Sequence, residues 1–246
     1  MLIIYDNTFT GFLTAIFDAF CTRDEVEIIC ESRFMPTLES YTISQTNKEK
    51  AHKVLAVLEE KAGKSAVDTV YTTWLSHRDG IDTVLVDYIK LCMKMEHDPI
   101  DMRQNETVYK VAKTARNVSE ECHRFLGFIR FRKLEDDIFI ADMTPDNDIL
   151  PLIKRHFIDR FHDQKFMIRD LSYKRILMYD GKGHSVVGKL SDAAVLDYAN
   201  NDEFEHMWCS YYKVMTIKER LNPRCQMNFM PKKYWKNIMR KLGFFR

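Results

Sequence analysis

The stretch that decides the fold is residues 118–170, VSEECHRFLGFIRFRKLEDDIFIADMTPDNDILPLIKRHFIDRFHDQKFMIRD. Its pattern indicates the end of a helix, a β-hairpin, a second helix and a strand. Residues 127–133 and 137–142 form the expected hairpin. Pro151 places the start of the following helix near Asn147, because proline is tolerated only in the first turn of a helix. Residues 166–170 and 175–179 predict a second strand pair.

This ββ-α-ββ order predicts an antiparallel sheet packed with helices. Upstream, residues 2–5, an aromatic helix from Phe9 and residues 25–31 predict a β-α-β opening. A capping box at residues 46–49 opens a helix that Gly63 ends, and helices at 65–74, 81–96 and 105–125 follow. We therefore expect an α+β protein. Its predicted parts are a β-α-β and helical part over residues 1–80 and an antiparallel-sheet domain over residues 81–246.

Charge is distributed unevenly along the chain. Residues 218–246 hold nine Lys or Arg and one acid, Glu219, a net charge of +8, which leaves −7 for residues 1–217. A basic end on an acidic body favours a polyanionic partner or an intramolecular contact. We expect a helix at 202–218, a turn at Asn222–Pro223 and a basic helix at 231–242.

Several classes of protein are disfavoured. The first 20 residues carry two acids and no basic n-region, which argues against a signal peptide. No run of about 18 apolar residues predicts a membrane span. The six cysteines form no CxxC pair, and no close His/Cys/carboxylate spacing indicates a metal site. We therefore expect a reduced, cytoplasmic protein with no metal, no cofactor and no membrane partner.

The first candidate site is the predicted strand 127–133. Phe128, Arg130 and Arg132 would share one face of it and could contact the bases and phosphates of nucleic acid. Residues 127–131 also echo the end of an RNA-recognition signature, although the signature's glycine is replaced by Phe125. The alternative is an amphipathic strand whose arginine stems cover the edge of the core.

The second candidate site rests on histidines. His156 and Arg160 are four residues apart on one helix face, and with Asp170 they could form an acid–base or anion-binding set. His123, at the end of the preceding helix, is a further catalytic candidate, and the adjacent Arg124 is a candidate for binding nucleic acid. The alternative is that each histidine is a hydrogen-bonded structural residue.

The third candidate site is the C-terminal region, where basic and aromatic residues alternate. Such a composition is typical of segments that follow a nucleic-acid backbone and stack on its bases. The alternative is a basic segment that docks on the chain's own acidic body. The candidate residues are Arg220, Asn222, Arg224, Gln226, Lys232, Lys233, Tyr234 and Trp235.

Several motifs together resemble a bacterial family of domains of unknown function. They are E-x-H-R-F-x-G-F-I-R-F (121–131), P-D-x-D-I-L-P-L (145–152), H-F-x-x-R-F-x-x-Q (156–164), I-R-D (168–170) and R-x-N-P-R-x-Q-x-x-x-M-P-x-x-Y-W (220–235). The opening Tyr5–Phe9 is also similar, with Asn7 where the family pattern has Gly. Asn is the residue best able to replace Gly in a left-handed turn, so we expect that turn to persist.

The resemblance implies a role in DNA metabolism or DNA repair, beside a radical S-adenosylmethionine protein. Some relatives of the family carry the domain fused to a uracil-DNA-glycosylase-like domain. The leading hypothesis is therefore an accessory protein that binds nucleic acid, which we expect to be DNA, and works with such a partner. The alternatives are an enzyme acting on a nucleotide or nucleic acid through His156, Arg160 and Asp170, and a module that only binds proteins.

Overall fold

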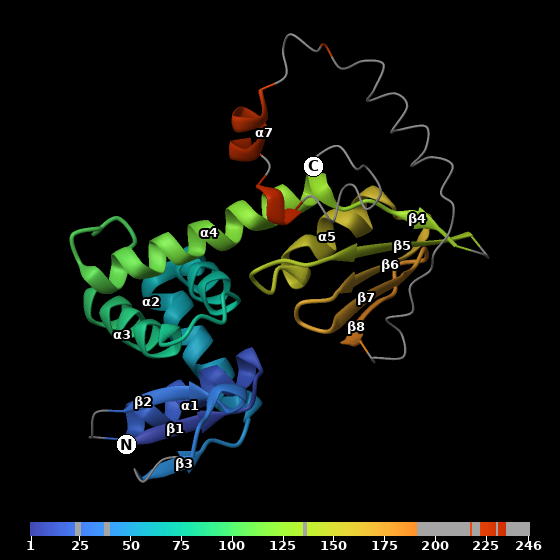
Figure 1. Cartoon of the computed structure of the whole chain (residues 1–246). Helices are drawn as coiled ribbons and strands as arrows, with labels where there is room; N and C mark the ends of the chain where they lie inside the picture. The colour runs from blue at the N-terminus through green and yellow to red at the C-terminus, as the bar shows by residue number, and fades with distance from the viewer. Residues whose placement is uncertain are drawn as a thin grey trace. The chain divides into compact units, whose positions relative to one another are not determined.

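A computed structural model describes residues 1–22, 26–36, 40–134, 137–190, 217, 222–229 and 231–234 (Figure 1). The chain divides into two compact units, residues 1–120 (unit 1) and 121–246 (unit 2). The sequence placed the division near residue 80, whereas these units meet within one long helix. The domain limits stay a prediction. The α+β class is confirmed, since both units combine helices with a sheet.

Unit 1 begins with a small parallel sheet, of which the β-α-β pattern predicted the first two strands and the structure adds a third. Its strands β1 (Leu2–Tyr5), β2 (Glu27–Cys30) and β3 (Tyr41–Ile43) lie in the order β2-β1-β3. All four residues of β1 are buried, because it is the central strand. Helix α1 (Phe9–Cys21) connects β1 to β2, and its Thr8 cap accepts a hydrogen bond from the Gly11 N–H.

Three helices complete this part of the chain: α2 (Lys48–Trp74), α3 (Ile81–Met95) and α4 (Glu106–Phe128). The two helices predicted on either side of Gly63 are the two parts of α2, and Gly63 forms the kink with φ of 80°. The predicted capping box is wrong in one respect. Asn47 caps α2, while Thr46 donates its hydroxyl to Asp6 at 2.6 Å.

Unit 2 contains a five-stranded sheet in the order β4-β5-β6-β7-β8. The strands are β4 (Arg132–Lys133), β5 (Ile138–Met143), β6 (Lys165–Asp170), β7 (Arg175–Asp180) and β8 (Ser185–Lys189), with helix α5 (Leu150–Arg160) between β5 and β6. The antiparallel prediction holds for three strand pairs. It is wrong for β5 and β6, which pair in parallel because α5 returns the chain to the end of the sheet where β5 began.

The predicted strand 127–133 is mostly wrong. Helix α4 continues to Phe128, and only Arg132 and Lys133 form a strand. The helical spacing continues because Phe125 and Phe128, three residues apart, both contact the ring of Tyr234. Phe128, Arg130 and Arg132 therefore do not share a strand face, and the echo of an RNA-recognition strand has no structural basis.

The C-terminal region also differs from its prediction. Pro223 begins the short helix α7 (Pro223–Phe229) instead of ending a turn, as a proline can at a first helical position. A 3-10 turn, η5 (Lys232–Tyr234), lies where the basic helix was predicted to start. The helix predicted at 202–218 and the rest of the one at 231–242 fall outside the described residues. Among the described helices, none has the length and apolar character that a membrane crossing requires.

Candidate functional site

The parallel pair β5 and β6 ends at two residues that are partners in register, Met143 and Asp170. The loop 144–149 and the turn 171–174 follow these strand ends, so they leave the same edge of the sheet. In sheets with parallel strands, this edge is where ligands commonly bind. We call Glu121, Asp146, Asp148 and Asp170 the acidic loop cluster, because all four contact or form these connections.

Glu121 fixes the loop 144–149 from α4. It is 2% exposed, and each carboxylate oxygen accepts two hydrogen bonds. The backbone N–H groups of Asp146 and Asn147 donate at 2.9 Å, and the Asn147 side chain donates at 2.5 Å. The Tyr234 hydroxyl donates at 3.0 Å. A buried carboxylate with four donors is fully satisfied, which identifies Glu121 as the anchor of the loop.

Asp170 is the least exposed member of the cluster, at 0%. Its Oδ1 accepts hydrogen bonds from the N–H groups of Ser172 and Tyr173, at 2.9 and 3.1 Å, and its Oδ2 is buried with no hydrogen-bond partner. Burial raises the pKa of Asp170 to about 7, and the nearby Asp148 carboxylate adds to this. Asp170 is thus a carboxylic acid that titrates near neutral pH.

Arg175 supplies the positive charge beside these acids. It is the register partner of Asp170 across β6 and β7, and its guanidinium pairs with Asp148, which is 3% exposed. One guanidinium therefore faces two buried carboxyl groups. Two buried negative charges with one cation are unfavourable, which is consistent with a protonated Asp170.

The segment 231–234 attaches to the same loop. Tyr234 is 1% exposed, with its ring 5.4 Å from the rings of both Phe125 and Phe128. The Lys233 ammonium pairs with Asp146 and lies 4.7 Å from the Tyr234 ring centre. The motifs at 121–131, 145–152, 168–170 and 220–235 therefore supply neighbouring residues of one cluster. Sequence reasoning chose Asp170 and Tyr234 from them and missed Glu121, Asp148 and Arg175, although the motifs contained the first two.

The predicted catalytic residues are not brought together by contacts. His156 lies on α5 with its ring 5.2 Å from that of Phe157, and its Nε2 is buried without a hydrogen bond. Arg160 is exposed, 5.7 Å from the Phe161 ring. His123 is exposed on α4. Within the described part of the chain, no hydrogen bond or ion pair joins Asp170 to any of these three side chains.

The arginines predicted to contact nucleic acid have separate surroundings. Arg130 is exposed and donates to the carbonyl oxygens of Gly127 and Ile129, at 2.6 and 3.0 Å. Arg124 is half-buried on α4. Arg132 pairs with Asp142 at 3.0 Å, and the buried Arg169 binds the same carboxylate at 2.6 Å. Arg132 therefore helps to join β4 to β5, and it shares the Asp142 carboxylate with Arg169.

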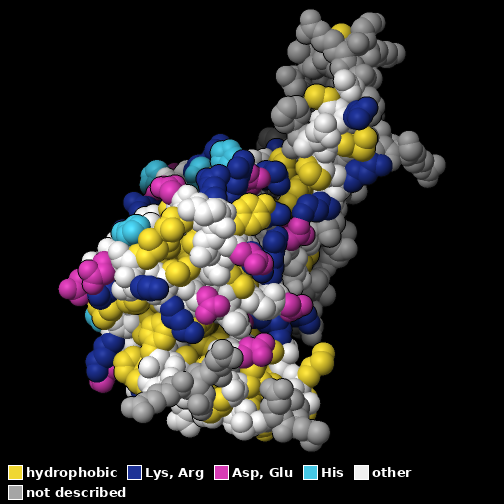
Figure 2. Space-filling view, turned by 90° about the vertical axis from the view of Figure 1, so that its left-hand side faces the viewer, with side chains coloured by type: hydrophobic (Ala, Val, Ile, Leu, Met, Phe, Trp, Pro, Cys, Tyr) yellow, Lys and Arg dark blue, Asp and Glu magenta, His cyan; other side chains and the backbone are white. Residues whose placement is uncertain are grey.

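The described basic residues of the C-terminal region are exposed. Asn222, Arg224, Lys232 and Lys233 are exposed, and Tyr234 is buried. Gln226 lies in α7, while Arg220 and Trp235 fall outside the described residues. Figure 2 shows Lys and Arg side chains interspersed with Asp and Glu over the face in view, so that face carries no large patch of one sign.

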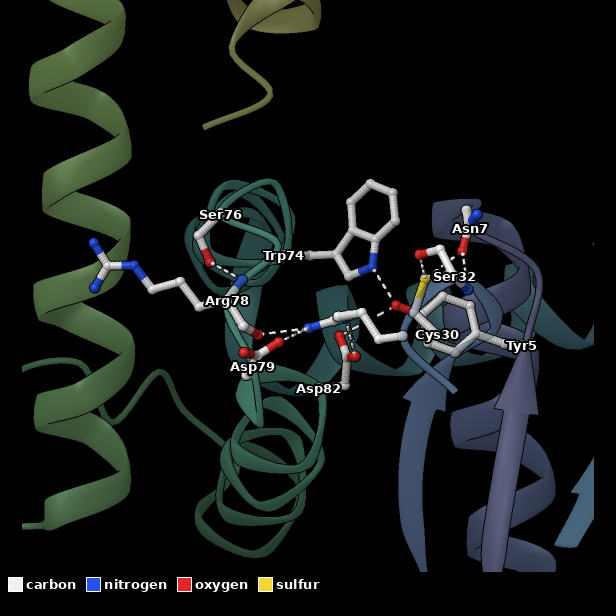
Figure 3. A network of polar contacts seen from close by, with 10 residues as sticks. Tyr5, Asn7, Cys30, Ser32, Trp74, Ser76, Arg78, Asp79 and Asp82 are labelled. Carbon is white, nitrogen blue, oxygen red and sulfur yellow. Dashed lines mark hydrogen bonds and ion pairs between the residues drawn. The ribbon is translucent and has the colours of Figure 1, made fainter. Parts of the chain in front are cut away.

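Unit 1 contains a polar network that the sequence did not predict (Figure 3). The Trp74 Nε1–H donates to the Tyr5 hydroxyl at 3.0 Å, and that hydroxyl donates to Asp82 at 3.1 Å. Arg33 pairs with the other Asp82 oxygen at 2.5 Å. Burial raises the pKa of Asp82, while the Arg33 charge opposes this rise. These contacts join β1, α2, α3 and the segment after β2. The buried polar groups therefore have a structural role, which is to hold these elements together.

Asn7 lies at the edge of that network. Its φ is not positive, so the left-handed turn expected there is absent. The Asn7 Oδ1 instead accepts from the Ser32 N–H at 3.2 Å and contacts the Cys30 thiol, which is also 3.1 Å from the Ser32 hydroxyl. Asn7 thereby links the ends of β1 and β2, a contact that glycine could not make.

No group of three or more His, Cys, Asp or Glu side chains suited to a metal ion occurs among the described residues. Comparison with protein-family models gives a match. The model of a family described as a domain of unknown function, DUF4130, matches residues 79–239. These residues include the whole acidic loop cluster and segment 222–234. No curated protein matches the chain.

Proposed function

The chain belongs to the DUF4130 family of domains of unknown function, and we propose that it is an accessory protein of DNA metabolism that binds nucleic acid through residues 222–234. The observation that supports this proposal is the combination of exposed cations with a buried anchor. Arg224, Lys232 and Lys233 are exposed, while Tyr234, next to Lys233 in sequence, is buried and donates its hydroxyl to Glu121. The net charge of +8 over residues 218–246 adds long-range attraction for a polyanion.

The anchor gives the cations a fixed starting position. A flexible basic segment loses conformational freedom when it binds, and this loss weakens binding. Tyr234 removes part of that cost beforehand, because its ring is held by Phe125 and Phe128 and its hydroxyl by Glu121. Lys233 shares its charge with Asp146, so we expect Arg224 to make a stronger phosphate contact than Lys233.

The partner and the pathway rest on the family resemblance alone. We propose that the nucleic acid is DNA and that the protein works with a radical S-adenosylmethionine protein in DNA repair. The partner would supply the chemistry, and this chain would hold the nucleic acid. The proposal that only proteins are bound remains as the competing assignment for the same segment.

Binding can be tested by fluorescence anisotropy with single- and double-stranded oligonucleotides at low salt. Each phosphate contact contributes about 0.9 to the slope of log affinity against log salt concentration for duplex DNA. Replacing Arg224, Lys232 and Lys233 with Ala should therefore reduce the slope by roughly 2–3. The matched control replaces three exposed lysines of unit 1, Lys53, Lys64 and Lys94. Absence of binding, with and without the partner, would refute the proposal.

One observation favours an enzyme as a second candidate function. Asp170 has a pKa of about 7 and an oxygen without a hydrogen bond, which suits a general acid or base. Because Asp170 is fully buried, a nucleotide would reach it only after the loop 144–149 moves. Turnover of a nucleotide substrate that is lost in Asp170→Asn, while oligonucleotide binding is kept, would support this candidate.

A further inference from the structure

Strand β3 is an open edge of the unit 1 sheet. Among the residues that the structure describes, it pairs with β1 alone, and Figure 1 shows it on the rim of that sheet. All three residues are exposed, with Tyr41 at 49% and Ile43 at 66%. No charged residue and no proline occurs between Ser40 and Thr46. Proteins usually protect such edges with lysine, proline or a bulge, and β3 has none of these.

The hydrogen bonds to β1 define which backbone groups remain available. The Leu2 N–H donates to the Ser40 carbonyl, and the Ser44 N–H donates to the Ile4 carbonyl. Successive residues of a strand alternate in the direction of their backbone groups. Ser40, Thr42 and Ser44 therefore face β1, whereas the N–H and C=O groups of Tyr41 and Ile43 point away from the sheet.

The sequence of this edge is self-complementary. Residues 40–44 read Ser-Tyr-Thr-Ile-Ser. If two copies of the strand lie antiparallel with Thr42 at the two-fold axis, each Tyr41 faces an Ile43, Thr42 faces Thr42 and Ser40 faces Ser44. Aromatic with β-branched and Thr with Thr are favourable cross-strand pairs, and no like charges meet.

The backbone supports the same register. In an antiparallel pair, opposite residues either exchange two hydrogen bonds or exchange none, in alternation. Tyr41 and Ile43 have outward groups and would form the two hydrogen-bonded pairs. Thr42, whose groups are used by β1, would occupy the non-bonded pair between them. Side-chain pattern and backbone direction thus independently select one alignment.

We propose that β3 is a homodimer interface, through which two copies of this chain join their sheets into one of six strands in the order β2-β1-β3-β3-β1-β2. A closed two-fold contact uses the same patch on both copies, so no open edge remains at β3. The interface is small, and its area lies at the low end of specific interfaces, so the dimer is weak and its population depends on concentration. This inference is independent of the proposed nucleic-acid binding.

Cross-linking tests the register directly. In the proposed dimer the two Thr42 Cα atoms are about 4.5 Å apart, within disulfide range. Thr42→Cys, in a background with the exposed Cys21 and Cys225 changed to serine, should give a covalent dimer on mild oxidation. The matched control is Ile43→Cys. In the proposed dimer the two substituted residues would lie two positions apart along the paired strands. Their Cα atoms would be about 8 Å apart, which is too far for a disulfide.

Sedimentation of the intact chain tests the association without a cross-link. Wild type should dimerise at roughly 10–500 µM, and Ile43→Lys should be monomeric over that range because it places charge at the edge. Val57→Lys, at an exposed apolar residue of α2, should dimerise as wild type does. A wild-type chain that stays monomeric, together with no Thr42→Cys cross-link, would overturn the proposal and leave the edge to a strand of another protein. Cross-linking at Ile43 as fast as at Thr42 would also overturn it.

Discussion

Tyr234 donates its hydroxyl to Glu121 Oε1 at 3.0 Å, across 113 residues of sequence. The hydrogen bond joins the two ends of unit 2. Glu121, in α4, is the first residue of unit 2, and Tyr234 lies in the last part of the chain that the structure describes. Glu121 also accepts the N–H groups of Asp146 and Asn147. The position of the loop 144–149 and that of the basic segment therefore depend on the same carboxylate.

Tyr234→Phe should lower the stability of unit 2. The phenylalanine keeps the contacts with Phe125 and Phe128, but it removes one donor from a buried carboxylate. A hydrogen bond to a charged group contributes about 1.5–3 kcal/mol, and the three remaining donors to Glu121 place the expected loss near 1.5 kcal/mol. Urea unfolding followed by unit 2 amide signals measures this change. Tyr109→Phe, at an exposed tyrosine of α4, is the control and should change nothing. Equal effects would show that the hydroxyl of Tyr234 has no special role.

Asp170 predicts a pH dependence of stability. Its folded-state pKa, about 7, lies above the 3.8 of an ordinary aspartate, so the folded state holds the proton more tightly than the unfolded state. The stabilising contribution is complete below about pH 4 and is lost as pH rises toward 7. Asp170→Asn keeps the acceptor for Ser172 and Tyr173 and cannot ionise. The free energy of unfolding of the variant relative to wild type should increase by about 2–4 kcal/mol between pH 4 and pH 8.

Two measurements check this assignment. Unfolding of both proteins at several pH values gives the difference directly, and carbon NMR of the carboxyl groups gives the titration of Asp170 itself. Glu96, an exposed acid paired with Lys61, provides the contrasting case because that pair lowers its pKa. A constant difference between Asp170→Asn and wild type over the whole range would contradict a raised pKa.

Arg33→Met should destabilise unit 1 by about 3 kcal/mol at pH 8, because it leaves the Asp82 carboxylate buried without its cation. The loss should become smaller as pH falls, since the pKa of Asp82 is already raised by burial and would rise further without Arg33. The double variant Arg33→Met/Asp82→Asn should recover part of the stability. A double variant less stable than either single one would show that the two residues do not act as a pair.

Two glycine-to-alanine changes should have opposite effects. A Cβ atom on Gly11 would lie 1.8 Å from Asp6 Oδ1, so Gly11→Ala must displace the carboxylate that binds Thr8 and Thr46. We expect a loss of about 2 kcal/mol or more. A Cβ on Gly127, in α4, would meet nothing within 4 Å, and Gly127→Ala should stabilise the helix by about 0.5–1 kcal/mol. Thermal unfolding of both variants measures whether each change lowers or raises the stability.

Local patterns predicted most of the elements. The helical faces of α1 to α3 and α5, the opening strands β1 and β2, and the strands β5 to β7 follow from residue spacing. The strand predicted at 127–133 failed because alternation within seven residues competed with a helical repeat from the preceding 20. Phe125 and Phe128 fit either pattern, and only the ring of Tyr234, over 100 residues away, decides for the helix. Long-range packing of this kind leaves no trace in a local window.

The candidate site was predictable only in part. Sequence motifs named the segments that meet around Asp170 and Tyr234, because several motifs contain acids next to strands. They did not indicate which acid is held by hydrogen bonds, because that depends on how deeply each side chain is buried. Glu121 has four donors, and Asp170 has an oxygen with none. Arg175 was missed because an arginine at the start of a strand has no distinctive spacing.

The separation of Glu121 and Tyr234 along the chain has a consequence for synthesis. A ribosome adding about 5–20 residues per second makes Tyr234 roughly 6–23 s after Glu121. During that interval the carboxylate lacks its hydroxyl donor, and Phe125 and Phe128 lack the ring that covers them. The network of Tyr5, Trp74 and Asp82, by contrast, is complete when residue 82 has been made. The nascent chain therefore exposes an aromatic surface of unit 2 for many seconds, which is a period when a chaperone could bind it.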